Sequence, residues 1–275
     1  MTISDFSISP ASGEHAIEVM ALAVEWTQPL DDNVIGEIES FYESSVDLKS
    51  SFPVVREIQG VSIQVENSGS AFNAARKRGF QMIQPGEGQS PAWALIVHPE
   101  FLTCNCMAYD RWSSVKPKAL AFMESILRIA TKTNFVQAVG VQYHDRFAAD
   151  TQDAIEAMRR LFNSENRWLS PHVLEQAFPW SIKQSWFHGL EEGKLTHNLL
   201  AVDLKNVEGG SLSFEIGGQH RMLFQDSSVE KPRTVELPEI SSSLDELHAI
   251  NKAVLCELLD SDICVNIGLC EREGL

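Results

Sequence analysis

The chain has 275 residues, 44% of them hydrophobic, which is enough for one large domain or two compact halves with a real core. It carries 38 acidic and 22 basic residues, a formal net charge of -16, and the excess of acid is present in both halves. Because a field of this sign repels phosphate backbones, nonspecific binding of nucleic acid is disfavoured, and a basic protein partner fits better.

The sequence predicts no targeting or membrane segment. The first residues, "MTISDFSISPASGEHAIEV", lack the basic start and the apolar stretch of a signal peptide. No apolar run approaches the roughly 20 residues that a membrane helix needs. We therefore expect a cytoplasmic protein.

The first half predicts several strands and two helices. A strand is expected over 15–26, followed by a helix over 29–46 that Asp31 or Asp32 can cap. Further along the chain, alternating or continuous apolar patterns predict strands over 61–66, 80–84, 92–98 and 101–109, a helix over 114–130, and a strand over 135–147.

The second half predicts a four-stranded antiparallel meander. Its expected strands are 180–189, 195–204, 211–216 and 219–225, and short separators that contain glycine favour hairpin turns between them. A polar connection over 226–242 follows. Ser243 and Glu246 then form a capping box ahead of an amphipathic helix that should cover the meander.

Both halves follow one plan, in which consecutive strands precede a long amphipathic helix. The predicted fold class is α+β, with antiparallel β-meanders each followed by a long amphipathic helix, and a duplicated unit is one interpretation of this plan. The expected halves are residues 1–150 and 151–275, and packing of the two as one domain stays open.

The motifs for common chemistries are missing from the sequence. No glycine-rich phosphate loop or G-x-S-x-G motif occurs, so neither a nucleotide site nor a hydrolase elbow is predicted. The five cysteines are an odd number, scattered, and do not suggest a secreted disulfide framework. His98, Cys104 and Cys106 lack the second ligand pair of a zinc knuckle. We therefore predict no catalytic residue, no metal and no cofactor, and we favour a protein that is not an enzyme.

Two polar patches are candidate binding surfaces. The first is "AYDRW", where Tyr109, Asp110, Arg111 and Trp112 stand between a strand and a helix. These residue types are frequent interface anchors. A strand-to-helix corner, with Trp112 packed down and its polar neighbours exposed, is the simpler interpretation.

The second patch is "VGVQYHDRF" at 139–147, whose residues alternate between two faces of a strand. Counting by twos places Gln142, His144 and Arg146 on one face, and Tyr143 with Asp145 on the other. An acid on the apolar face needs a partner or a place beyond the sheet edge. The polar row could line a groove, although such rows more often face solvent.

This strand resembles the glycine–apolar–Arg–Tyr–apolar–Asn strand of a sporadically distributed bacterial family of uncharacterised proteins of similar length. Gly140, Tyr143 and Asp145 stand where that family has Gly, Tyr and Asn, whereas Gln142 replaces its Arg. The resemblance extends to "IEVMALAVEW", to "SFP" at 51–53 and to "YDRW". It implies association with mobile or defence-related gene clusters, and the family offers no established activity to transfer to this chain.

The leading hypothesis is a non-catalytic interaction protein, antitoxin-like or chaperone-like, with a basic or unfolded protein partner; a homo-oligomer stays open. The alternative is an enzyme or small-ligand binder that uses Tyr143, His144 and Arg146. Nucleic-acid binding ranks last, since "ARKRG" at 75–79 is the one short basic candidate.

Overall fold

We analysed a computed structural model of the chain. The structure describes residues 6–11, 13, 15–60, 63–66, 69–72, 76–88, 90–190, 194–207, 210–224 and 235–270, and the side chains of all of these except 59–78. The chain divides into two compact units. Unit 1 contains residues up to Met20, Gly140–Leu223 and Ser242–Leu275, and unit 2 contains Ala21–Val139 and Phe224–Ser241.

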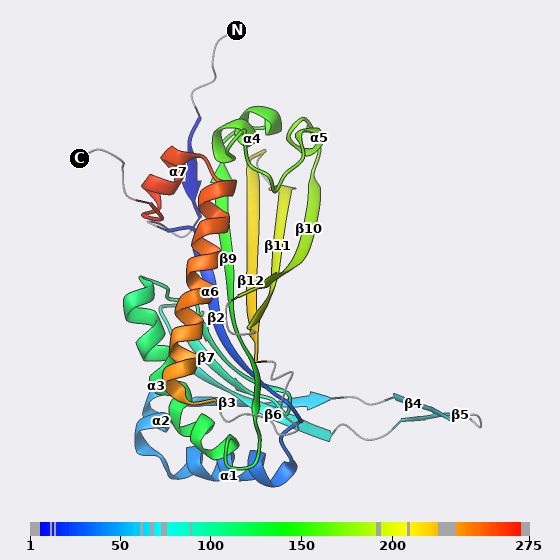
Figure 1. Cartoon of the computed structure of the whole chain (residues 1–275), viewed down its shortest axis with the longest axis vertical. Helices are drawn as coiled ribbons and strands as arrows, with labels where there is room; N and C mark the ends of the chain where they lie inside the picture. Colours follow the sequence, from blue (N-terminus) through cyan, green and yellow to red (C-terminus); the bar gives the residue numbers. More distant parts are fainter. Residues whose placement is uncertain are drawn as a thin grey trace. The chain divides into compact units, whose positions relative to one another are not determined.

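Ten strands hydrogen-bond in one antiparallel sheet, in the order β10-β11-β12-β9-β2-β8-β7-β6-β3, with β1 paired to β9 (Figure 1). Their bounds are β1 (Ile8–Pro10), β2 (Ile17–Trp26), β3 (Val54–Gly60), β6 (Arg76–Pro85), β7 (Pro91–Val97), β8 (Phe101–Cys106), β9 (Val136–Ala149), β10 (Trp180–Gly189), β11 (Leu195–Asn206) and β12 (Leu212–Leu223). β4 (Ile63–Glu66) and β5 (Gly69–Phe72) form a separate two-stranded hairpin.

The described residues form seven helices: α1 (Asp32–Ser44), α2 (Val46–Ser51), α3 (Trp112–Ala130), α4 (Ala154–Leu161), α5 (Pro171–Leu174), α6 (Leu237–Leu258) and α7 (Ser261–Asn266). Asp31, one of the two caps expected for the first helix, accepts hydrogen bonds from the backbone N–H groups of Asn33 and Val34. Within the described ranges, no helix combines the length and the apolarity needed to span a membrane.

The predicted fold class is wrong. Strands from both halves of the sequence belong to one large sheet, and five of the seven described helices have 13 residues or fewer, so the architecture is not a meander followed each time by a long helix. The reason is a long-range pairing. Ala16 O accepts from the Arg146 N–H at 2.8 Å, and Phe135 O accepts from the Thr27 N–H at 2.9 Å, so the first strand lies against β9. Local periodicity carries no information about such a partner.

The predicted four-stranded meander is also wrong, because its last two strands are one. β12 continues through Gly217 and Gly218, and neither glycine has a positive φ. A Cβ atom on Gly218 would overlap Asn251 Oδ1 and would lie 3.4 Å from His220 Nε2. This glycine therefore serves the close approach of a helix to the strand, and it does not form a turn.

The expected start of the last helix needs a similar correction. α6 begins at Leu237, so Ser243 lies inside the helix and is not its N-cap. The Ser243 side chain is fully buried, and its Oγ has no hydrogen-bond partner among the described residues. Of the polar connection predicted over 226–242, residues 226–234 lie outside the described residues.

Two other predictions fall within residues 59–78, whose side chains lie outside the described part of the structure. The strand expected over 61–66 is described only from Ile63, as β4, and it follows β3, which the sequence did not predict. Arg76, Lys77 and Arg78 belong to β6, but their side chains are outside the described part of the chain.

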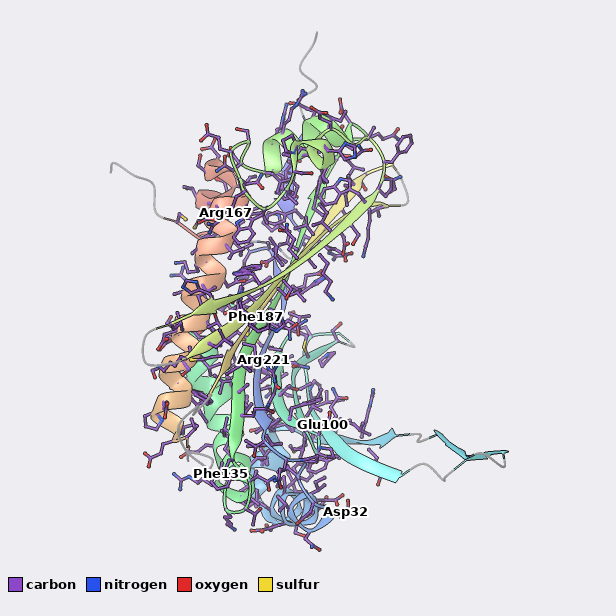
Figure 2. All side chains as sticks on the ribbon, turned by 45° about the vertical axis from the view of Figure 1, so that its right-hand side comes forward. Asp32, Glu100, Phe135, Arg167, Phe187 and Arg221 are labelled. Atoms are coloured by element: carbon purple, nitrogen blue, oxygen red, sulfur yellow. The ribbon has the colours of Figure 1, made fainter. Side chains whose placement is uncertain are left out.

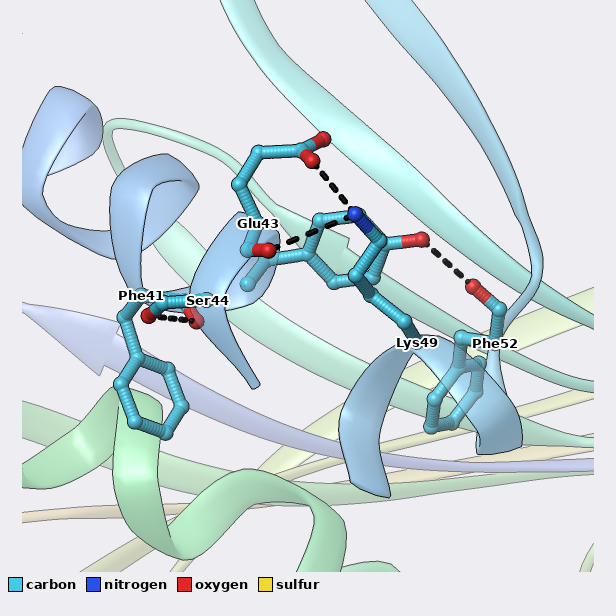
Figure 3. Close-up of polar contacts among 6 residues, drawn as sticks. Phe41, Glu43, Ser44, Lys49 and Phe52 are labelled. Carbon is cyan, nitrogen blue, oxygen red and sulfur yellow. Dashed lines mark hydrogen bonds and ion pairs between the residues drawn. The ribbon is translucent and has the colours of Figure 1, made fainter. Parts of the chain in front are cut away.

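In unit 2, helices α1, α2 and α3 accompany strands β3, β6, β7 and β8. Phe122 of α3 packs edge-on against Phe52, with ring centroids 4.8 Å apart, and against Trp93 of β7 at 5.5 Å. The corner between α1 and α2 is held by polar contacts (Figure 3). There the Tyr42 hydroxyl donates to Phe52 O at 2.8 Å, and Lys49 pairs with Glu43 at 2.7 Å.

In unit 1, the four-stranded part of the sheet is covered on one face. Phe147 of β9, Leu200 and Val202 of β11, and Phe214 and Ile216 of β12 share a buried cluster with the apolar sides of α4 and α6. Figure 1 shows α6 running along β9. The other face carries the polar residues of the alternation, and Gln142, His144 and Arg146 of the predicted site lie on it.

Candidate functional site

β9 distributes the residues of the second predicted patch over two faces. Gln142 is exposed and His144 and Arg146 are half-buried on the outer face, whereas Tyr143 and Asp145 are buried on the inner face. The strand therefore does not bring Tyr143 together with His144 and Arg146 in one site.

On the outer face, His144 and Arg146 belong to a row of ion pairs that crosses neighbouring strands. Arg146 pairs with Glu18 at 2.5 Å, and the His144 ring lies 3.4 Å from Glu18 and 3.7 Å from Glu215. Lys205 then pairs with Glu215 at 2.5 Å, and this hydrogen bond holds the pKa of Glu215 below its usual value. Each charge in this row has an opposite neighbour, which is how a solvated sheet face is normally stabilised.

On the inner face, Tyr143 binds the helix that covers it. The Tyr143 hydroxyl and His248 Nδ1 of α6 are 2.8 Å apart, and Tyr143 is only 1% exposed. A buried tyrosine hydroxyl needs a partner, and His248 supplies it. This contact fixes the helix against β9.

Asp145, two residues further along β9, is the acid that the alternation placed on the apolar face. It is 3% exposed, and none of the described residues donates a hydrogen bond to its carboxylate or pairs with it. Desolvation by burial raises its pKa to about 7. At neutral pH a large share of these carboxyl groups is consequently protonated.

A fully buried histidine of unit 1, His220 of β12, lies between two asparagines. His220 Nδ1 is 3.0 Å from Asn198 Oδ1 of β11, and Nε2 is 3.1 Å from Asn251 Oδ1 of α6. The Asn198 amide nitrogen donates to Thr196 Oγ1 at 3.1 Å, and Thr196 Oγ1 donates to His188 O at 3.1 Å. We name these four side chains, Thr196, Asn198, His220 and Asn251, the His220 network.

The His220 ring is neutral at physiological pH, because burial lowers its pKa to about 4. A neutral imidazole has one N–H and can donate to only one of the two amide oxygens. Thr196 already fixes the orientation of the Asn198 amide, so the ring donates to Asn198. The Asn251 amide must then turn its nitrogen toward Nε2. The His220 network ties α6 to two strands, and it has no exposed reacting atom.

A serine and a histidine meet on the outer face, in the arrangement of a nucleophile and its base. Ser185 Oγ of β10 and His197 Nε2 of β11 are 2.6 Å apart, and the Phe187 ring stacks on the His197 ring with centroids 4.6 Å apart. Among the described residues no carboxylate contacts His197 to orient it. The pair therefore lacks the third group that such a base requires.

The first predicted patch lies in unit 2, at the corner between β8 and α3. Arg111 is the N-cap residue of α3 without a side-chain cap bond, and Asp110 accepts from Ser114 Oγ at 3.4 Å. Lys116 lies over the Trp112 ring, 6.0 Å from its centroid, and Tyr109 is half-buried beside the corner. These four residues are placed by the end of a strand and the start of a helix.

The cysteines considered for a metal are buried on one face of β8. Burial raises the pKa of Cys106 to about 11 and raises that of Cys104 further. His98 stacks on Phe101 with ring centroids 4.5 Å apart, and its Nδ1 accepts from the Glu100 N–H. Both thiols are therefore protonated groups inside the core of unit 2.

β10 is the end strand of the sheet, and its outer edge has no paired strand among the described residues. All ten of its residues pair with β11 without a register shift. Phe187 on this strand is 62% exposed, and Phe178, two residues before the start of the strand, is 76% exposed. Figure 2 labels Phe187 and Arg221, which the register places on either side of His197 across three strands.

Several residues of these sites were not predicted from the sequence, although a signal for two of them exists. Leu212, Phe214 and Ile216 alternate, and continuing this count through the glycines places His220 on the buried face. Asn251 similarly falls between Leu247 and Val254 on the apolar side of the last helix. A polar residue in phase with an apolar face indicates a buried polar contact.

Neither the models of protein families nor the curated proteins include a match to this chain. The resemblance to a sporadically distributed bacterial family therefore stays a prediction from the residues of β9.

Proposed function

We propose that this protein is a non-catalytic interaction component that binds an extended, basic segment of a partner protein along β10. The observation that carries the proposal is the outer edge of this strand. Ten consecutive residues there pair on one side only among the described residues, which provides a template for adding one more strand.

Edge strands in natural proteins are usually protected against such pairing by proline, by several charges, by a bulge or by being short. β10 has no proline, no bulge and one charged side chain, Lys183. β3, at the other end of the sheet order, has seven residues and a register shift between Ile58 and Gln59. The contrast supports a binding role for β10 in particular.

The charge of the chain supports a basic partner. The net charge of the whole chain is -16, and beside β10 the register places the carboxylate of Asp203 next to Ser181, whereas Glu215 on the following strand is already paired with Lys205. Exposed aromatic rings at Phe178 and Phe187 offer apolar contacts at or beside the two ends of the strand. The acidic excess of the whole chain and these exposed rings together favour an extended segment with basic and apolar side chains.

The alternative, an enzyme or small-ligand binder at the β9 strand, has less support. Tyr143 faces α6 while His144 and Arg146 face outward, and the ion pairs of the outer face are mutually satisfied. The Ser185–His197 pair has no orienting carboxylate within the described residues. No described arrangement combines a nucleophile, its base and an orienting group.

The test uses the phase of the β10–β11 hydrogen bonds. The Leu190 N–H donates to Lys194 O at 2.8 Å. Since hydrogen-bonded pairs alternate along an antiparallel ladder, the N–H groups of Ser181, Lys183, Ser185 and Phe187 point to the outer edge. Lys183→Pro therefore blocks strand addition and leaves the bonds to β11 in place. Lys183→Ala is the matched control, because it changes the side chain and keeps the N–H.

The full chain, tagged and used as bait in lysate of its source cells, should recover one stoichiometric partner with the wild type and with Lys183→Ala, and lose it with Lys183→Pro. Ser181→Pro is a second edge variant, and circular dichroism verifies that each variant is folded. The recovered segment should be basic, and its capture should weaken as ionic strength rises.

Three results would overturn the proposal. They are repeated recovery of the bait alone, equal recovery by the proline and alanine variants, and an acidic bound segment. Light scattering on the purified chain tests whether a second copy of the chain occupies the edge of β10. A wild-type dimer that becomes a monomer in Lys183→Pro would assign the edge to a second copy and overturn the proposal of a different partner.

A further inference from the structure

Three of the five cysteines meet in unit 1, although they are spread over the last helices of the chain. Cys256 lies near the end of α6, Cys264 lies on α7, and Cys270 follows the turn after α7. Their three sulfur atoms all lie within 4.8 Å of one another. Cys264 is buried, and the other two are half-buried.

The junction between α6 and α7 is fixed to the rest of unit 1, so the positions of the first two cysteines are determined. Leu259 forms an antiparallel bridge with Phe162, and the Asp260 N–H donates to Leu161 O at 2.9 Å. The Asp260 side chain then caps α7 by accepting from the Asp262 N–H at 2.9 Å. These contacts hold the start of α7 beside the end of α6.

The third cysteine is brought back by a Schellman turn at the end of α7. Gly268 has a φ of 68°, the left-handed conformation that this turn needs. The Leu269 N–H donates to Cys264 O at 2.8 Å, and the Gly268 N–H donates to Val265 O at 3.0 Å. The Cys270 N–H also approaches Cys264 O, at 3.4 Å, so the chain folds directly over Cys264.

The donor set is soft, because the cluster consists of three thiols within the part of the chain that the structure describes. Thiolates select Zn²⁺ and similar thiophilic ions, whereas Mg²⁺ and Ca²⁺ prefer carboxylate and carbonyl oxygens. Burial raises the pKa of Cys264 to about 12 and that of Cys256 to about 11, so these two thiols are protonated in the absence of a metal. Lys252, four residues before Cys256 on α6, acts in the opposite direction and favours the thiolate.

We propose that Cys256, Cys264 and Cys270 form a zinc site, in which three thiolates bind Zn²⁺ and solvent takes the fourth position. Binding replaces three S–H protons with three Zn–S bonds and releases those protons to solvent, so the ion and its thiolates together carry one negative charge. With Zn–S bonds of about 2.3 Å, tetrahedral sulfurs lie about 3.8 Å apart. The present sulfur separations, all within 4.8 Å, are close to this spacing, and two of the three side chains are half-buried and can rotate toward it.

The site would fasten the end of α6, α7 and the following turn to one another. A bound ion stabilises the folded chain because the unfolded chain does not hold the three thiolates together. Zinc should therefore raise the melting temperature of the full chain, and a chelator should lower it.

The experiment measures metal content and melting temperature of the full chain, purified with a reductant that does not bind metal. We expect one zinc ion per wild-type chain, and a thiolate charge-transfer band after replacement of zinc by Co²⁺. Cys256→Ser and Cys270→Ser should each lose the stoichiometric ion, the band and the effect of the chelator. These two are chosen because both side chains are half-buried, so the substitutions are compatible with folding.

Cys106→Ala is the control, since it removes a cysteine of β8 that is outside the cluster. It should keep the ion, the band and the effect of the chelator. The proposal is overturned by wild-type chain that binds no zinc, by variants that retain the Co²⁺ band, or by a disulfide between two of the three cysteines in chain purified under reducing conditions.

Discussion

At the scale of single residues, two buried titratable groups in unit 1 act on stability in opposite directions as pH changes. Burial raises the pKa of Asp145 to about 7 and lowers the pKa of His220 to about 4. Both lie on the face of the sheet that packs against the helices, so neither charged form is solvated. Their effects can be separated by substitution.

The first prediction concerns Asp145. Below its ordinary pKa of 3.8 the carboxyl is protonated in the folded and unfolded chains alike. As pH rises toward about 7, only the unfolded chain loses its proton, so the free energy of unfolding falls by about 4 kcal/mol. Asp145→Asn should therefore gain stability relative to the wild type between pH 4 and pH 7, as measured by denaturant unfolding.

Asp150→Asn is the control, since Asp150 is exposed at the end of the same strand and has no side-chain contact in the described structure. Comparing the two substitutions separates the effect of the buried carboxyl from that of an exposed one. A difference between Asp145→Asn and the wild type that is independent of pH would show that the carboxyl is solvated or paired.

The second prediction concerns His220, whose folded pKa lies below the ordinary 6.5. Its contribution to stability is complete above pH 6.5 and is lost as pH falls toward about 4, a loss of about 3 kcal/mol. His220→Gln does not titrate, so its deficit relative to the wild type should shrink as pH falls through this range. Urea unfolding at several pH values measures the deficit.

His188→Gln provides the comparison, because this histidine is exposed on β10. A deficit for His220→Gln that stays constant from pH 7 to pH 4 would mean that the folded protein accommodates the imidazolium. This result would contradict the assignment of a neutral His220 ring.

At the scale of secondary-structure elements, adjacent glycines in β12 have different roles. A Cβ at Gly218 would overlap Asn251 Oδ1, whereas a Cβ at Gly217 would lie 3.7 Å from the Ala201 Cβ, an ordinary contact. The approach of α6 to β12, and with it the His220 network, therefore depends on glycine at position 218.

The third prediction follows from this difference. Gly218→Ala should lower the free energy of unfolding by about 1–3 kcal/mol, since the added methyl group displaces Asn251 from His220. Gly217→Ala should be neutral or stabilising by about 0.5 kcal/mol, because alanine loses less backbone entropy on folding. Denaturant midpoints compare the two. Equal effects of the two substitutions would contradict the assigned packing.

Elements whose pattern is local could be predicted, and those that depend on distant contacts could not. The start of α1 follows from its Asp31 cap, and the two faces of β9 follow from its alternation. Gly217 and Gly218 were interpreted as a hairpin turn because turn chemistry is local, while Asn251, which makes glycine necessary there, is 33 residues from Gly218. The start of α6 was misplaced because Ser243 fits a capping box and is nevertheless buried.

At the scale of the whole molecule, the fold class could not be obtained from the sequence because it depends on one pairing. β2 and β9 join strands of both halves into a single sheet, and the residue pattern of either strand does not indicate that it pairs with the other. The same holds for the candidate sites. Cys256, Cys264 and Cys270 appeared scattered in the sequence and meet only through the Schellman turn and the α6–α7 junction.

The role of β10 is the central claim, and it also belongs to this scale, because an edge exists only once the order of the sheet is known. The strand ends that order, and among the described residues no strand covers its outer side. The backbone amides that point outward should exchange hydrogen rapidly when the edge is free and slowly when a partner strand occupies it.

Amide hydrogen exchange resolved by residue tests this most directly, on the purified chain alone and with its captured partner. In the free chain, the N–H groups of Ser181, Lys183, Ser185 and Phe187 should exchange much faster than those of Ile182, Gln184 and Trp186, which bond to β11. Addition of the partner should slow the outward set to the rate of the inward set. Outward amides that are already protected in the free monomer, or that stay fast in the complex, would contradict the account.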